Sequence, residues 1–153
     1  MTERNSTPCT DPARGDVFSY SPLTREADVA SLIAGSRKAQ AEWIAQPLRF
    51  RLEACRRLRD CMLQEADAIA TVISRDNGKT RVDAMSTEVF PALMALTYYM
   101  KKARTFLRPS GLGNGNLLLI NKRSRLLHHP YGVIGVISPW NYPFAIPFSD
   151  LVM

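Results

Sequence analysis

The sequence lacks several features that would each assign it to a particular class of protein. It has three cysteines, Cys9, Cys55 and Cys61, with no CxxC pair, so it predicts neither a disulfide framework nor a zinc knuckle, and a reducing compartment fits better. The first 20 residues contain no basic start followed by an apolar stretch, and no apolar run approaches the roughly 20 residues that cross a bilayer. These absences predict a soluble, cytoplasmic protein with no membrane segment and no metal site.

The composition is that of an ordinary globular protein, which excludes collagen-like, mucin-like and wholly disordered chains. Of the 153 residues, 46% are apolar and 22% are charged, which is enough for a hydrophobic core. Lysine and arginine number 20 against 14 acidic residues, a net charge of +6 that permits contact with phosphate without requiring nucleic acid. The basic stretch 49–59 is interleaved with Glu53, so we interpret it as a solvated face or an intersubunit contact rather than a nucleic-acid site.

Helical periodicity dominates the first two thirds of the chain. After an extended lead-in with a short edge strand at 17–20, three helices are expected, over 24–46, 48–75 and 81–107. Gly78 follows the second helix, and it tolerates the left-handed conformation that ends helices. Pro91 lacks an amide hydrogen and should kink the third helix near Thr87.

The last third of the chain is β-prone. Residues 110–116 are expected to form a flexible loop, and 117–121 with 123–129 one long strand or two short ones. The apolar run 131–138 is bounded by prolines and predicts a buried parallel strand, with a helix beginning near Tyr142. This order of elements predicts an α/β fold.

The pattern divides the chain into four parts. An extended lead-in covers 1–22, a three-helix part 23–108, a loop and β-ribbon 109–130, and the first strand and turn of a sheet 131–153. The last part is apolar to its end and has no helix cap, so we expect a truncated sheet unit that belongs to a longer protein.

The best candidate for a functional site is the turn after the predicted strand 131–138. Ligands of open α/β sheets bind beyond the carboxyl ends of strands, which is where this turn falls. Pro139 and Pro143 stiffen it, and Asn141 between them offers an amide with two donors. A rigidly placed donor suits the binding of an oxyanion. The alternative interpretation is that Asn141 only caps a helix and Trp140 only packs.

Residues 130–144, with the sequence PYGVIGVISPWNYPF, resemble the signature segment of the aldehyde dehydrogenase superfamily. Other stretches agree in order: DPARGD at 11–16, SRDNGK at 74–79 and the pair Tyr98 and Tyr99 resemble family segments, as do Trp43, Arg49, Arg51 and Leu58. The resemblance covers essentially the whole chain. It implies the N-terminal part of a family-like fold: three helices, a β-ribbon and the first strand of a parallel Rossmann-like sheet, incomplete here.

The resemblance implies an enzyme that oxidises an aldehyde to a carboxylic acid with NAD or NADP. In that reaction a cysteine thiolate adds to the carbonyl to form a thiohemiacetal, hydride passes to the nicotinamide, and a water activated by glutamate releases the acid. Asn141 matches the oxyanion-stabilising residue. Positions matching the cofactor cleft are Ile137, Ser138, Pro139, Trp140 and Asn141, and those matching or facing the substrate tunnel are Tyr142, Ile146 and Ser149.

The family's nucleophilic cysteine, catalytic glutamate, cofactor-binding lysine and glycine-rich turn lie beyond the matching segment. This sequence contains none of them, so the chain alone is predicted to be inactive as a dehydrogenase. The family also implies a homo-oligomer assembled with help from the ribbon at 117–129. The alternative function is a non-catalytic fragment that assembles with other chains through this ribbon.

Overall fold

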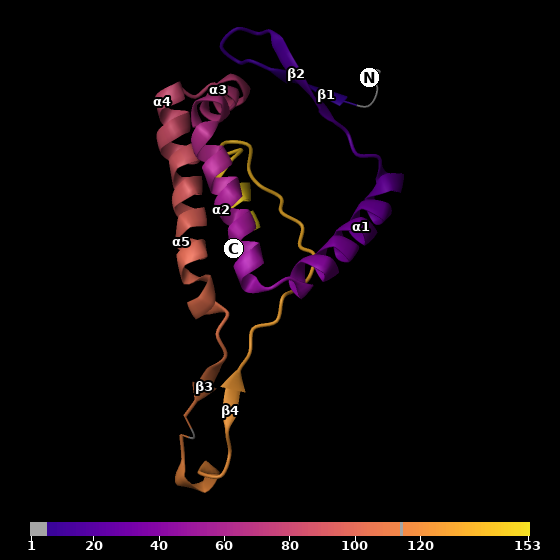
Figure 1. Cartoon of the computed structure of the whole chain (residues 1–153). Coiled ribbons are helices and arrows are strands. Elements are labelled where there is room, and N and C mark those ends of the chain that lie inside the picture. The colour runs from indigo at the N-terminus through magenta and orange to yellow at the C-terminus, as the bar shows by residue number, and fades with distance from the viewer. Residues whose placement is uncertain (1–5, 114) are drawn as a thin grey trace.

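The computed structural model describes residues 6–113 and 115–153. It shows a helical body from which a narrow two-stranded arm projects (Figure 1). Among the described residues, the strands form two separate antiparallel sheets of two strands each. None of the described helices combines the length and the apolar character needed to cross a bilayer.

The N-terminal segment forms a hairpin that packs on the helical body. β1 (Ser6–Thr10) pairs with β2 (Val17–Pro22), which confirms the strand expected from residue 17 and adds a partner that the sequence did not predict. Residues 1–5 of the predicted lead-in lie outside the described residues. The Arg75 guanidinium lies 4.4 Å from the Phe18 ring centroid and 3.7 Å from a carboxylate oxygen of Asp11, so these contacts hold the hairpin to the helices.

The first expected helix is confirmed as α1 (Glu26–Ala45). Its N-cap is Arg25, and the Arg25 side chain pairs with Asp28 in the first turn. No residue of α1 is buried, although its sequence carries an apolar face: Val29 is 43% exposed and Leu32 56%. The apolar face of α1 is therefore not covered by the described residues.

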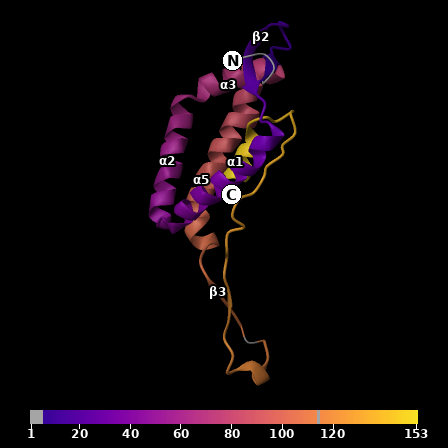
Figure 2. The same cartoon turned by 90° about the vertical axis from the view of Figure 1, so that its right-hand side faces the viewer.

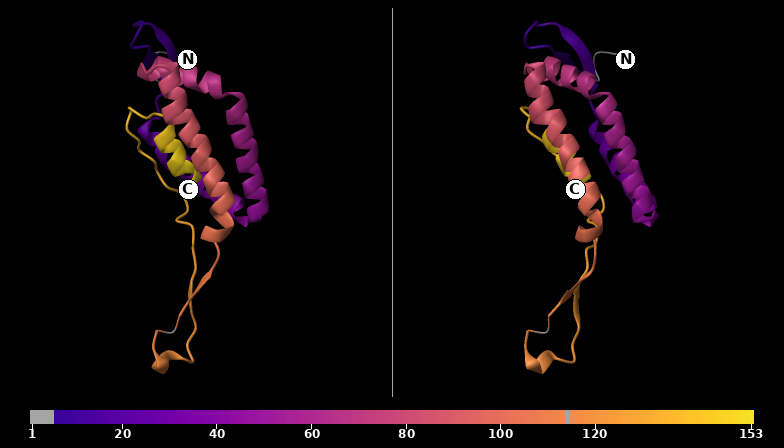
Figure 3. Two further views of the ribbon diagram at one scale, coloured as in Figure 1. Left: turned by 90° about the vertical axis from the view of Figure 1, so that its left-hand side faces the viewer. Right: turned by 60° about the vertical axis from the view of Figure 1, so that its left-hand side comes forward.

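The expectation of one helix over 48–75 is wrong, because the chain forms two helices there. α2 (Leu48–Gln64) and α3 (Ala66–Asn77) are separated at Glu65, whose φ of −96° and ψ of 9° are not helical. The two helices run in clearly different directions (Figure 3). Gly78 ends α3 with a φ of +78°, as predicted, and a β-carbon there would lie 2.9 Å from Pro12 of the hairpin.

The third expected helix is continuous but irregular. α4 (Arg81–Ala84) leads into the π-helix η2 (Met85–Val89), which leads into α5 (Phe90–Phe106). The irregularity includes Thr87, where the kink was predicted, because Pro91 cannot donate to a carbonyl four residues earlier. A wider π turn accommodates the missing hydrogen bond.

The core lies between α2, α3 and the η2–α5 segment. Its best buried apolar side chains include Met62, Ile73, Val89 and Leu96, each at most 5% exposed. α6 (Ala145–Val152) packs against α5, and its Phe148 and Val152 side chains join the cluster of Met62 and Leu96; the two helices lie side by side in the left view of Figure 3.

The arm corrects the sequence prediction in two places. β3 (Ser110–Leu112) pairs with β4 (Ser124–Leu126), so part of the expected loop 110–116 is a strand; Asn114 lies outside the described residues. Residues expected as a strand from 117 instead form the 3-10 helix η3 (Leu117–Leu119). The Asn116 side chain accepts a hydrogen bond from the Leu118 amide at 3.1 Å, which favours a turn over a strand.

The predicted buried strand at 131–138 is not present. This segment has no regular secondary structure, and the side chains of Tyr131 and Ile137 are fully exposed, at 99% and 101%. A buried parallel strand needs neighbouring strands, and the described part of the chain contains none beside this segment. The segment runs back along the body to the start of α6 (Figure 2).

Candidate functional site

The turn that carries Asn141 is attached to the helical body on both of its sides. The side-chain amide of Asn77, the last residue of α3, donates a hydrogen bond to the Trp140 carbonyl at 3.0 Å. The ammonium group of Lys79 lies 3.9 Å from the centroid of the Tyr142 ring, a cation–π contact. The residues immediately before and after Asn141 are therefore held by the last residue of α3 and by Lys79, two residues further on.

Glu88 connects this turn to the core. Its side chain is fully buried, and its Oε1 accepts a hydrogen bond from the Lys79 Nζ at 2.5 Å. Its Oε2 accepts from the backbone amides of Phe144 at 2.8 Å and Ala145 at 3.2 Å, which begin α6. The first amides of a helix have no partner within the helix, and a negative charge there is favourable.

Asn141 itself is exposed. Among residues 6–113 and 115–153, its side chain makes no hydrogen bond, so it does not cap α6; Glu88 takes that role. Trp140 is 84% exposed, so it does not pack in the body either. Among the described residues, neither the capping by Asn141 nor the packing of Trp140 that the alternative interpretation requires is present.

The other predicted site residues lie along the same turn and the start of α6. Ile137 and Pro139 are exposed, and Tyr142 and Ile146 are each 37% exposed. Ser138 is half-buried, and its hydroxyl oxygen has no hydrogen-bond partner among the described residues. Ser149 donates its hydroxyl hydrogen bond to the Ala145 carbonyl at 2.7 Å within α6.

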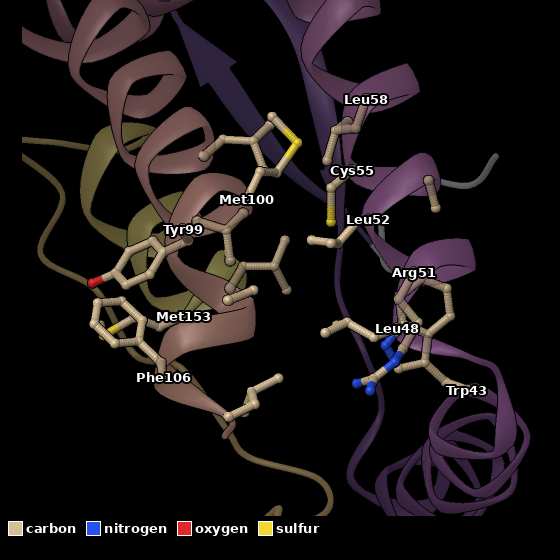
Figure 4. Close-up of a pocket in the computed structure, with 16 residues that line it drawn as sticks. Trp43, Leu48, Arg51, Leu52, Cys55, Leu58, Tyr99, Met100, Phe106 and Met153 are labelled. Atoms are coloured by element: carbon tan, nitrogen blue, oxygen red, sulfur yellow. The ribbon is translucent and has the colours of Figure 1, made fainter. Parts of the chain in front are cut away.

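A cavity of about 400 Å³ lies elsewhere, between α2 and α5 (Figure 4). Apolar side chains such as Leu52 and Tyr99 line it, together with Cys55 and the guanidinium-bearing Arg51. None of the predicted site residues lines this cavity. Cys55 is half-buried and belongs to this apolar lining.

Sequence reasoning missed Glu88, Lys79 and Asn77. A signal for Glu88 was present, because it lies four residues before the buried Ala92 and three after Met85, within the apolar stripe of its helix. A carboxylate on an apolar helix face needs a partner. The partners in α6 lie 56 and 57 residues away, so periodicity could not identify them.

The chain is similar to known proteins over its whole length. A family model described as the aldehyde dehydrogenase family matches residues 1–153. The chain is 33% identical over 152 residues to a Mycolicibacterium smegmatis protein assigned as a succinate-semialdehyde dehydrogenase using NADP(+), covering 99% of this chain and 29% of that protein. It is 30% identical over 141 residues to the 4,4'-diapolycopene aldehyde oxidase of Methylomonas sp, covering 92% of this chain and 27% of that protein.

A solved structure supports the same relationship. The crystal structure of an aldehyde dehydrogenase from Brucella melitensis biovar abortus 2308 superposes with a TM-score of 0.86 at 25% identity. The match covers 96% of this chain and 29% of that one. The chain therefore spans less than a third of the length of each of these three relatives.

Proposed function

The chain belongs to the aldehyde dehydrogenase family, and from this premise we propose that it forms part of the active site of an NAD(P)-dependent aldehyde dehydrogenase. The proposed contribution is the oxyanion-binding amide of Asn141 and one wall of the cofactor cleft. The observation that carries the proposal is the combination of a free, exposed amide with a turn held on both sides.

Asn141 has the chemistry for this role. Its amide carries two N–H donors, which can point at an aldehyde oxygen as that oxygen becomes negative. A donor that is already in place stabilises this charge without reorganisation during the reaction. The contacts of Trp140 and Tyr142 with the helical body hold the backbone on both sides of Asn141, which supports this proposal.

The thiolate that attacks the carbonyl is proposed to come from a part of the enzyme outside residues 1–153. Cys55 and Cys61 lie on α2 and Cys9 lies on β1, so none of them shares the turn with Asn141. When the thiolate sulfur bonds to the carbonyl carbon, the carbonyl π electrons move to the oxygen. That oxygen is the atom to which the Asn141 amide would donate.

The residues before Asn141 fit a cofactor that has both an aromatic ring and hydroxyl groups. Ile137 and Trp140 present exposed apolar surface for a ring, and the Ser138 hydroxyl lacks a partner among the described residues. NAD or NADP, when bound, supplies a nicotinamide that accepts the hydride. We propose Ile137, Ser138, Pro139 and Trp140 as cofactor contacts, and Tyr142, Ile146 and Ser149 as contacts of an aldehyde substrate.

The proposal is tested by exchanging segments between relatives. In the Mycolicibacterium smegmatis relative, the matching segment is replaced by residues 1–153, and aldehyde-dependent reduction of NADP+ is measured with succinate semialdehyde. The expected result is turnover by the chimera, because the segment supplies the same wall of the site. The unmodified relative is the positive control, and the isolated chain is expected to reduce no NADP+.

In a second chimera, only residues 130–149 are exchanged. This smaller exchange distinguishes inactivity caused by misfolding at the junction of the larger chimera from inactivity of the turn itself. A chimera of either kind that unfolds cooperatively but shows no turnover would overturn the proposal. Turnover by the isolated chain would contradict the proposal that the attacking thiolate comes from outside residues 1–153.

We further propose that the β3–β4 arm mediates assembly of the protein into an oligomer. The arm projects away from the body (Figure 1) and carries Leu117 and Leu118, which are 84% and 86% exposed. Contiguous exposed apolar side chains mark interaction surfaces. The same surface serves the alternative, non-catalytic function in assembly.

Replacement of both Leu117 and Leu118 by serine is expected to weaken self-association of the chain. Sedimentation equilibrium over a range of concentrations measures the mass, and the double variant is expected to shift toward the monomer. Val82→Ser is the control, since Val82 is 75% exposed on α4, away from the arm. Equal association of the parent and the double variant would contradict the role of the arm.

A further inference from the structure

The buried carboxylate of Glu88 has no part in the chemistry proposed above. It is fully buried in η2, in the cluster of elements that forms the core. Burying a carboxylate is costly unless its oxygens are all partnered. The hydrogen-bond partners of the Glu88 carboxylate therefore indicate which parts of the structure this side chain stabilises.

Both carboxylate oxygens of Glu88 accept hydrogen bonds, and each accepts them from a different part of the chain. Oε1 faces the ammonium group of Lys79 at 2.5 Å, whereas Oε2 faces the amides of Phe144 and Ala145. One side chain thus joins a residue at the end of the α3 segment to the first residues of α6. The Glu88 side chain thereby fixes the position of Phe144 and Ala145, where the turn ends and α6 begins.

Lys79 carries this connection on to the turn. Its ammonium group contacts both Glu88 and the ring of Tyr142, and its own backbone carbonyl accepts a hydrogen bond from the Ser74 hydroxyl at 2.6 Å. The Lys79 side chain is 18% exposed, so water competes little for its charge. Tyr142 and Phe144 are therefore anchored on the two groups of a single ion pair.

We infer that Glu88 and Lys79 are positioning residues for Asn141, holding the residues after it so that the backbone that carries its side-chain amide keeps one place. The inference rests on the function proposed for Asn141. The two residues are proposed to touch neither substrate nor cofactor and to act through the turn. Support of a functional group by neighbours that fix its backbone is how a site keeps its geometry.

Glu88→Gln separates this role from simple packing, because glutamine has the same shape. A glutamine amide has one acceptor oxygen and one NH2 donor. It can accept from the two backbone amides of α6 or from Lys79, but not from both sides. Lys79→Met keeps an unbranched side chain that is one atom shorter, and it removes the cation from both Glu88 and Tyr142.

Hydrogen exchange in the 153-residue chain tests the anchoring directly. In Glu88→Gln, the amides of Phe144 and Ala145 are expected to exchange about tenfold faster or more, since each loses a bond to a charged acceptor. Core amides of α5, such as that of Leu96, are expected to accelerate by a smaller factor, which reports the loss of overall stability. The control is Glu53→Gln, which changes a half-exposed glutamate on α2.

Two outcomes of the exchange experiment would overturn the inference. Unchanged exchange at Phe144 and Ala145 in both Glu88→Gln and Glu88→Ala would show that Glu88 does not anchor α6. Equal acceleration there and throughout α5 would show that Glu88 only stabilises the fold as a whole.

A double-mutant cycle in the active chimera tests whether Glu88 acts through Asn141. Glu88→Gln is expected to lower kcat about tenfold with KM for the aldehyde unchanged, as for an interaction made only in the transition state. In an Asn141→Ala background, the same change is expected to cost nothing further.

The outcomes separate the inference from the proposed function. Losses that multiply in the double variant would overturn the positioning role while leaving the function of Asn141 in place. Full activity of Asn141→Ala would overturn the proposed function, and the exchange rates would still decide whether Glu88 anchors the turn.

Discussion

Replacement of Glu88 by alanine is expected to lower the free energy of unfolding of the chain by about 3–5 kcal/mol. The change leaves the largely buried ammonium group of Lys79 without its carboxylate and the amides of Phe144 and Ala145 without their acceptor. Removing one partner of a buried ion pair costs more than the pair contributes, because the remaining charge stays buried. Denaturant unfolding followed by circular dichroism measures the loss.

The control for this experiment is Glu53→Ala. The Glu53 side chain is 50% exposed and pairs with Arg56 at 2.7 Å on the surface of α2. Surface pairs of this kind contribute about 0–1 kcal/mol. Equal losses for the two variants would contradict the importance assigned to burial of Glu88.

Replacement of Asn141 by alanine in the active chimera is expected to lower kcat by roughly 100- to 1,000-fold. The amide is proposed to donate to an oxygen whose charge develops only during the reaction, so binding of NADP+ is expected to stay as it was. The stability of the protein is also expected to stay the same, since the Asn141 side chain is exposed. Steady-state kinetics and a cofactor titration measure the two quantities.

The matched control is Asn121→Ala, which removes an exposed amide from the arm. It is expected to leave turnover unchanged. A chimera with Asn141→Ala that turns over at the parent rate would show that the oxyanion is stabilised by other groups.

Helix positions could be predicted from the sequence where a local signal exists. Gly78 ends α3 because the left-handed conformation is local to that residue, and Pro91 marks the irregular turn because its missing amide acts on a carbonyl one turn earlier. The break at Glu65 was missed because the apolar stripe continues from α2 to α3 with no interruption in spacing. A change in helix direction that keeps the buried face leaves no periodic signal.

The strand at 131–138 and the supports of the Asn141 turn could not be predicted correctly, because they depend on contacts between residues far apart in the sequence. Residues 131–138 have the apolar composition of a buried strand, yet a strand also needs neighbours, which composition does not describe. The turn at Asn141 was predicted from local features, whereas its supports were not, because Glu88 and α6 meet across more than 50 residues of chain. The role of Asn141 itself stays a prediction.

The π-helix η2 also limits how the length of this part of the chain can vary. A π turn contains one residue more than the α-helix needs. Deleting the exposed Ser86 would let that turn close into an ordinary α-helical turn, so the helical segments before and after it could keep their relative orientation. A further inserted residue could not be absorbed in this way and would rotate the preceding helical segment by about 100° relative to α5. In this stretch, a single insertion should therefore be more damaging than the deletion of an exposed residue.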